Sequence, residues 1–313
     1  MELDRIQRAL RNPIIIARYL DARRRRFRWR YRQRKNNGIC SINIERSVGF
    51  FAQLGWCLYI WAYCEEQQLI PDVSVTNPLF TDPRRGPDCL AYYFEATPKP
   101  ADARVVETTR IHNIHELGLP TRCLTPTLER AAALARRHLR VRPEIADEVE
   151  QFCRRHFDEA GVLGVHFRGT DKSSEAPRVP YEQCARAVRQ FLDRHPEVNR
   201  MFVASDEAPF IQYMLETFPS VSQCSCDDQR SDGRLAVHDL RFGGDNYRKG
   251  REALVNCLLL SRCHTVIRTA STLSGWASVF NPQLRVIMLN RPYDGFSYFP
   301  DKLLIATAEP DQP

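Results

Sequence analysis

The sequence lacks the two glycine-rich signatures with which many nucleotide-binding folds hold phosphate groups. No Gly-x-Gly-x-x-Gly follows a candidate strand, and no Gly-x-x-x-x-Gly-Lys-Ser/Thr occurs anywhere in the 313 residues. A dehydrogenase and a P-loop NTPase are therefore disfavoured. A phosphate site in this chain would have to be assembled from an arginine and from helix N-termini.

Patterns that hold metal ions are missing as well. The eleven cysteines include no Cys-x-x-Cys pair, and Cys224 and Cys226 form only a Cys-x-Cys. No Asp-x-Asp stands in a convincing context, because Asp227 and Asp228 lie in a stretch rich in cysteine and serine. We expect neither a metal ion nor another cofactor.

The sequence also has no apolar run of about 18 residues and no recognisable secretory signal peptide. Several cysteines lie in apolar helical stretches, where a free thiol behaves as a small hydrophobic group. We therefore expect reduced thiols and a cytoplasmic protein.

Positive charge is concentrated at one end of the chain. Residues 1–36 carry a net charge of +10, whereas the other 277 residues carry −3. Within residues 23–35, nine of thirteen side chains are basic and three are aromatic. Such a stretch suits an anionic membrane surface, a nucleic-acid backbone or no dedicated partner at all. Because the body is slightly acidic and would repel phosphate backbones, we favour an anionic membrane surface over nucleic acid.

The rest of the chain is predicted to form two α/β units. We expect a basic arm over 1–36, an α/β unit over 38–158, a Rossmann-like unit over 159–300 and a tail over 301–313. Strands and helices alternate strictly in the second unit, which implies a parallel sheet covered on both faces. The predicted strands are 39–44, 70–76, 162–168, 200–204, one near 221, 264–268 and 284–289. The predicted helices are 50–69, 128–139, 145–157, 181–194, 208–217, 248–262 and 272–280. The expected fold class is thus α/β, with two Rossmann-like domains facing a cleft.

Polar residues crowd together at the end of one buried strand. The run Gly164 to Lys172 reads Gly-Val-His-Phe-Arg-Gly-Thr-Asp-Lys, and His166 and Arg168 share one face of the strand. The carboxyl ends of parallel strands face the ligand crevice, so these groups are placed where chemistry occurs. A buried cation at such a position needs an anionic partner. Arg168 is therefore a candidate to hold a diphosphate and to stabilise the charge that develops on it as a leaving group.

Two other strand-to-helix junctions could present backbone amides to an anion. Ser271 and Thr272 open the predicted helix 272–280, where either could cap it and where hydroxyl and amide groups could bind phosphate. Gly49 precedes the predicted helix 50–69 in the same way.

These three segments carry a resemblance to a known family. His-Phe-Arg-Gly-Thr-Asp-Lys resembles the His-x-Arg-x-Thr-Asp-Lys signature of the core and nodulation-type α1,6-fucosyltransferases. Gly-Phe-Phe-x-Gln-Leu from Gly49 resembles the first loop of transferases that use GDP-fucose, and Thr-Ala-Ser-Thr from Thr269 resembles the family's Thr-x-Ser-Ser. The resemblance implies a GT-B-like glycosyltransferase that moves fucose, with inversion, from GDP-fucose to a hydroxyl of a sugar or glycolipid acceptor. It also implies that the unit over 38–158 is the acceptor side and that the unit over 159–300 binds the nucleotide-sugar.

The resemblance also implies roles for individual residues in donor binding. Arg168, Ser271 and Thr272 would hold the donor phosphates, with the Gly49 loop, while His166 and Asp206 would help to hold the nucleotide. Asn256 stands where the family has an aspartate that contacts guanine. Because an amide offers both a donor and an acceptor, this departure leaves the identity of the base open.

The resemblance leaves two candidates for the general base. Glu175 is the nearest equivalent of the family's catalytic glutamate but lies one residue closer to the motif. Asp171 is the alternative, and Lys172 would steer or tune the base.

Two rival functions are a transferase of the same fold with another nucleotide-sugar donor, and an inactive transferase-like binding protein that acts through its basic arm.

Overall fold

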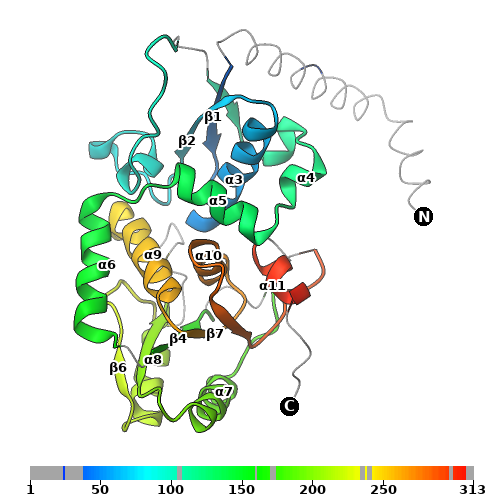
Figure 1. Ribbon diagram of the computed structural model, residues 1–313. Coiled ribbons are helices and arrows are strands. Elements are labelled where there is room, and N and C mark those ends of the chain that lie inside the picture. The colour runs from blue at the N-terminus through cyan, green and yellow to red at the C-terminus, as the bar shows by residue number, and fades with distance from the viewer. Residues whose placement is uncertain are drawn as a thin grey trace.

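The computed structural model describes residues 24, 38–103, 108–158, 161–169, 174–232, 237, 242–295 and 299–307. Apart from Arg24, the basic arm lies outside the described residues, and so do Asp171 and Lys172. The described chain forms two α/β units, which occupy the upper and lower parts of Figure 1.

The first unit is built on a small parallel sheet with the strand order β2-β1-β3. Strands β1 (Ile39–Glu45) and β2 (Ile70–Thr76) run side by side in register from Ile39 opposite Ile70, and β3 (Thr109–Ile111) pairs with the other edge of β1. Helix α3 (Phe50–Glu66) connects β1 to β2 and is buried over most of its surface because its sequence is almost entirely apolar. The unit also contains α4 (Thr121–Leu124), α5 (Leu128–His138) and the 3-10 turns Pro83–Arg85, Cys89–Tyr92 and Ile114–Leu117. Helix α6 (Pro143–His156), which was expected in the first unit, packs against α9 (Asn246–Ser261) of the second unit, where Arg251 pairs with Glu148.

The second unit contains a five-stranded parallel sheet with the order β6-β5-β4-β7-β8. Its strands are β4 (Val162–Phe167), β5 (Arg200–Ser205), β6 (Ser222–Cys224), β7 (Thr265–Arg268) and β8 (Arg285–Met288). Its helices are α7 (Tyr181–Arg194), α8 (Ala208–Thr217), α9 (Asn246–Ser261), α10 (Thr272–Phe280) and α11 (Asp301–Thr307). Every residue of the central strand β4 is buried, as its apolar sequence predicts for a strand that is covered on both faces.

The two faces of β4 meet different helices. Leu163, Val165 and Phe167 belong to a cluster with the buried residues of α7 and α8. Gly164 points the other way, where an added Cβ would lie 3.2 Å from Leu260 of α9. Because side chains alternate along a strand, His166 also faces the α9 side of the sheet. The polar side chain of His166 therefore lies on the face of the sheet that α9 covers.

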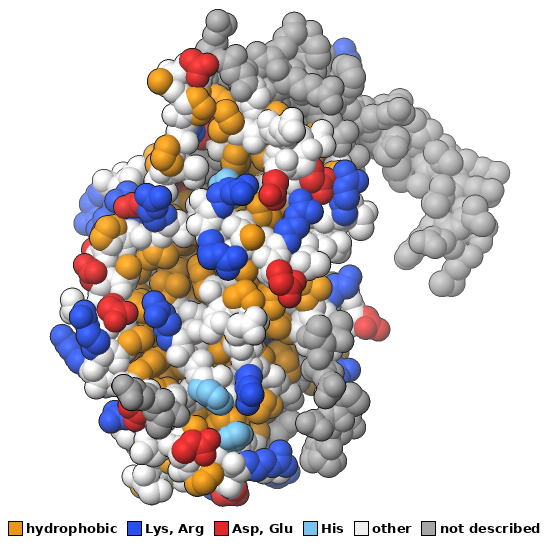
Figure 2. All heavy atoms as spheres, viewed as in Figure 1, with side chains coloured by type: hydrophobic (Ala, Val, Ile, Leu, Met, Phe, Trp, Pro, Cys, Tyr) orange, Lys and Arg blue, Asp and Glu red, His pale blue; other side chains and the backbone are white. Residues whose placement is uncertain are grey.

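Helices α9 and α10 join the two units. One continuous hydrophobic core runs from β1 and α3 through α9 and α10, and the rings of Phe51 and Trp276 lie 6.0 Å apart. At the start of α9, Asn246 Nδ2 donates to the Pro78 carbonyl at 3.0 Å and the Tyr93 hydroxyl donates to the Tyr247 carbonyl at 3.0 Å. The space-filling view in Figure 2 shows the face of the molecule that is seen in Figure 1. On this face, basic and acidic side chains are interspersed, with hydrophobic side chains between them.

The parallel second sheet and its covering helices are confirmed. The prediction missed the three-residue strand β3, the short helix α4 and helix α11. The segment expected as a tail therefore begins with a helix, and its first residue, Asp301, is only 4% exposed.

Candidate active site

A cleft of about 1020 Å³ lies between the two units at the carboxyl ends of the strands. All of the predicted site residues that the structure describes line this cleft. They are Gly49, His166, Arg168, Glu175, Asp206, Asn256, Ser271 and Thr272. The structure thus brings together residues that are more than 200 positions apart in the sequence. Asp171 and Lys172 lie outside the described residues.

The end of β4 is tied to the end of the neighbouring strand β7. The Arg168 backbone N–H donates to Thr269 Oγ1 at 2.9 Å, and the Thr269 N–H donates to the His166 carbonyl at 3.1 Å. These bonds extend the β4–β7 ladder past the last paired residues. They fix the half-buried Arg168 beside the segment that begins α10, so that a guanidinium and a helix N-terminus share one wall of the cleft.

His166 is buried in that wall, with 5% of its surface exposed. Burial, together with the positive charges of Arg268 and Arg168, holds the pKa of His166 well below its usual value. The imidazole is therefore neutral at pH 7 and needs no anionic partner. Its Nδ1 atom has no hydrogen-bond partner among the described residues.

The N-terminus of α10 differs from the expected capping arrangement. Ser271 is the N-cap residue, but neither its hydroxyl nor another side chain makes a capping hydrogen bond. The Ser271 N–H instead donates to Asp301 Oδ2 at 3.1 Å, and Arg268 Nη2 donates to the Ser271 carbonyl at 3.1 Å. Asp301 and Arg268 thus bind the N–H and the carbonyl of Ser271, while Ser271 and Thr272 both line the cleft.

The residue after Arg168 must be small because of a carboxylate from the next strand. A Cβ built on Gly169 would collide with Glu207 Oε1 and would lie 2.9 Å from Glu207 Cδ. Glu207 is only 3% exposed, and its carboxylate accepts a short hydrogen bond from the Tyr181 hydroxyl. Burial raises the pKa of Glu207 and also that of Tyr181. Asp206 lines the cleft, whereas Glu207 is not among the cleft residues and supports the turn that carries Arg168.

Asp228 is a cleft residue that the sequence analysis dismissed. It lies in the loop after β6, and its Oδ2 atom accepts a 2.8 Å hydrogen bond from Asn256 Nδ2. Burial, with a smaller contribution from Glu252, raises the pKa of Asp228 to about 6. No local sequence signal marks this contact, because it joins a loop to a helix 28 residues further along.

The described residues contain neither a metal-binding cluster nor a membrane-spanning helix. Within the described ranges, no group of three or more His, Cys, Asp or Glu side chains is arranged to hold a metal ion. Among the helices that the structure describes, none is long and apolar enough to span a membrane.

Two parallel α/β units facing one cleft define the class: this is an α/β protein with the GT-B-like fold. The chain belongs to the family described as Nodulation protein Z (NodZ), whose model matches residues 121–298.

Individual relatives support this placement. Nodulation protein Z of Bradyrhizobium diazoefficiens is 28% identical over 167 residues, which are 50% of this chain and 44% of that protein. The match thus spans less than half of that relative. The crystal structure of fucosyltransferase NodZ from Bradyrhizobium superposes with a TM-score of 0.52 at 16% identity, over 81% of this chain and 96% of that one. An Arabidopsis thaliana FUT1 mutant in complex with GDP gives a TM-score of 0.50 at 12% identity, over 84% and 72%. At these identities the solved structures show the fold.

Proposed function

We propose that this protein is an inverting glycosyltransferase that moves fucose from GDP-fucose to a hydroxyl group of a sugar or glycolipid. The observation that carries the proposal is the shared wall formed by Arg168 and the Ser271 end of α10, joined through Thr269. Membership of the NodZ family and the activity of its Bradyrhizobium relative, a fucosyltransferase, support the choice of donor.

In this proposal Arg168 binds the diphosphate of the donor. A guanidinium can hold two phosphate oxygens at once, and each charge-assisted hydrogen bond contributes about 1.5–3 kcal/mol. As the bond between the sugar and the diphosphate breaks, negative charge grows on the leaving GDP. A fixed cation at that position stabilises the transition state more than the ground state. Amide groups at the start of α10 and the Gly49 turn at the start of α3 would add to this field.

The reaction is a single displacement. An acceptor oxygen forms a bond to the anomeric carbon of fucose as the bond from that carbon to the phosphate oxygen breaks, and GDP leaves with the electron pair. The acceptor proton passes to a carboxylate, for which we propose the half-buried cleft residue Glu175. Asp171, the alternative base, and Lys172, which would tune the base, lie outside the described residues.

The donor assignment is tested by ligand-induced stabilisation. Thermal unfolding of the full chain would be followed with GDP, GDP-fucose, GDP-mannose and UDP, each with and without EDTA. A ligand at about 100 times its dissociation constant should add close to 2.7 kcal/mol to the free energy of unfolding. Stabilisation by GDP and GDP-fucose that EDTA leaves unchanged is the expected result. A response to UDP alone would show that the donor is another nucleotide-sugar.

The location of the protein and the partner of its basic arm remain separate proposals. We propose a cytoplasmic enzyme whose residues 23–35 contact an anionic membrane surface, on the basis of their charge and aromatic content. A chain lacking residues 1–36 should hydrolyse GDP-fucose as fast as the full chain but lose sedimentation with vesicles that contain anionic lipid. Loss of donor hydrolysis on this deletion would instead favour a function that depends on the arm.

A further inference from the structure

The cleft wall contains a carboxylate and an amide, those of Asp228 and Asn256, that are hydrogen-bonded to each other. Asn256 Nδ2 donates to Asp228 Oδ2 at 2.8 Å and to the Glu252 carbonyl at 2.8 Å. Both amide hydrogens are thus used, which fixes the orientation of the Asn256 side chain. Its Oδ1 atom has no hydrogen-bond partner among the described residues, although Asn256 is only 8% exposed. A buried acceptor without a donor is costly, and a bound ligand is one way to satisfy it.

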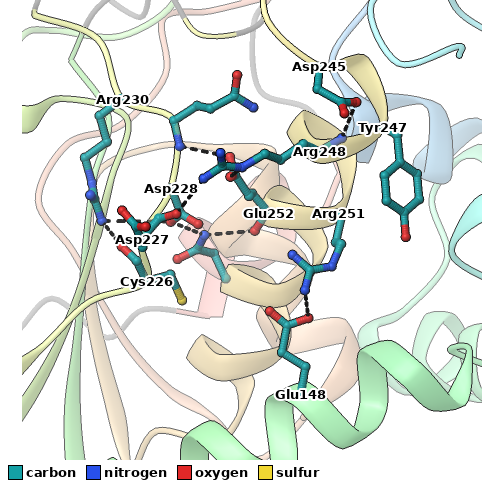
Figure 3. Close-up of polar contacts among 12 residues, drawn as sticks. Glu148, Cys226, Asp227, Asp228, Arg230, Asp245, Tyr247, Arg248, Arg251 and Glu252 are labelled. Carbon is teal, nitrogen blue, oxygen red and sulfur yellow. Dashed lines mark hydrogen bonds and ion pairs between the residues drawn. The ribbon is translucent and has the colours of Figure 1, made fainter.

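The loop that carries Asp228 is fastened to α9 on both sides of it (Figure 3). Arg248 Nη2 donates to the Asp227 carbonyl at 2.9 Å, and the Gln229 N–H donates to Glu252 Oε2 at 3.0 Å. Arg248 and Glu252 are themselves an ion pair one helical turn apart. Asp228 is therefore held in place before any ligand binds, as a specificity-determining group should be.

The atoms of Asp228 and Asn256 that can still bind a ligand are hydrogen-bond acceptors. Among the described residues, both partners of the Asp228 carboxylate contact Oδ2, namely Asn256 and, at 4.0 Å, Arg230. Asp228 Oδ1 and Asn256 Oδ1 therefore remain available to accept hydrogen bonds, and both residues line the cleft. A ligand that satisfies them has to present hydrogen-bond donors.

Among the common nucleobases, guanine presents two adjacent donors, N1–H and the 2-amino group, on one edge. A carboxylate accepts from both, whereas the same position would face an acceptor on adenine. We propose that Asp228, held by Asn256, reads this edge and selects guanine in the donor nucleotide. The carboxylate that the helix position Asn256 lacks is thus supplied from the loop beside it. The inference rests on the proposed function, because it assigns the base specificity of the same donor site.

Binding of nucleoside diphosphates to the full chain tests the assignment without any substitution. We expect GDP to bind at least about tenfold more tightly than inosine diphosphate, which lacks the 2-amino group and one charge-assisted hydrogen bond. Xanthosine diphosphate should bind most weakly of the three, because its 2-oxo group faces the carboxylate.

The variant Asp228→Asn makes the test sharper. An amide at this position can donate to a 2-oxo group, so affinity for GDP should fall by about 10- to 100-fold while affinity for xanthosine diphosphate rises above that of the wild type. The matched control is Glu148→Gln. Glu148 lies on α6 and its carboxylate pairs with Arg251 of α9, the helix that carries Asn256, but Glu148 does not line the cleft (Figure 3). Its ratio of GDP to xanthosine diphosphate affinity should equal that of the wild type.

The outcomes separate this inference from the function on which it rests. Tight GDP binding that Asp228→Asn leaves unchanged would overturn the base-reading role and leave the proposed donor intact. An equal loss for GDP, inosine diphosphate and UDP would also overturn it, because the carboxylate would then act on the ribose or on the fold. If the wild-type chain binds no guanine nucleotide, the proposed function fails together with the inference.

Discussion

Arg268 and Asp301 form a fully buried ion pair behind the N-terminus of α10. Arg268 ends β7 and is 0% exposed, and Asp301 begins α11 and is 4% exposed. The pair also holds both backbone groups of Ser271, since Arg268 bonds its carbonyl and Asp301 its N–H. The part of the cleft wall that would bind phosphate is therefore fixed by a contact across 33 residues of sequence.

The first prediction concerns this ion pair. Asp301→Ala should lower the free energy of unfolding by about 3–5 kcal/mol, because it leaves a buried guanidinium without its partner. Chemical denaturation measures the loss. Asp158→Ala is the matched control, since it removes a half-exposed carboxylate that pairs with Arg200, and it should cost less than about 1 kcal/mol. Similar losses in the two variants would contradict the importance given to the buried pair.

The second prediction concerns the turn after Arg168. Gly169→Ala should destabilise the chain by about 1–3 kcal/mol, because the new methyl group would collide with the Glu207 carboxylate. The collision has an identifiable partner, so the double variant Gly169→Ala with Glu207→Ala should be less destabilised than the sum of the two single changes. A double-mutant cycle provides the measurement. Additive losses would mean that the two side chains do not meet.

The third prediction is a pH dependence of stability. His138 stacks on Trp61 with ring centroids 5.0 Å apart, and burial, assisted by the positive charge of Arg137, lowers its pKa to about 4. The unfolded chain binds a proton to this residue below about pH 6.5 whereas the folded chain does not. The contribution of His138 to stability is thus complete above pH 6.5 and is lost as the pH falls toward 4. His138→Phe keeps a ring against Trp61, and its stability should fall less steeply over this range than that of the wild type.

The fourth prediction concerns the pH dependence of GDP binding. With the pKa of Asp228 raised to about 6, its carboxylate is ionised at pH 7.5 and becomes protonated as the pH falls through 6. The charged groups around it are Glu252, which raises the pKa, and Arg230 and Arg248, which lower it. GDP affinity should therefore weaken below pH 6. Asp228→Asn, measured in parallel, corrects for the titration of the phosphate itself. Identical pH profiles for the two proteins would contradict an ionised Asp228 at the base.

Local sequence patterns determined most of the second unit but not the contacts that complete the site. The bounds of α7, α8 and α10 were predicted to the residue, because apolar periodicity and proline or serine at the start mark them clearly. Strand β3 has only three residues and α11 seven, which is too short for a periodic pattern. Both therefore went unrecognised.

The features of the site that the sequence did not show depend on long-range proximity. The pKa of His166 is low mainly because the residue is buried, and Arg268, which is 102 residues away in the chain but lies beside it on the adjacent strand, lowers it further. Asp228 lines the cleft because hydrogen bonds to α9 hold its loop in place. Neither neighbour can be inferred from the residues that flank His166 or Asp228. The sequence motif nevertheless located the cleft, since a polar run at the end of a buried strand depends only on local pattern.

The central claim is that Arg168 stabilises the departing diphosphate, and turnover of GDP-fucose by Arg168→Ala tests it most directly. Release of GDP would be measured for the wild type and the variant, with circular dichroism and thermal unfolding to establish that both are folded. Removal of a cation that acts in the transition state should lower turnover by a factor of at least about 100, while the fold persists. Turnover by a folded Arg168→Ala protein at the wild-type rate would contradict the account.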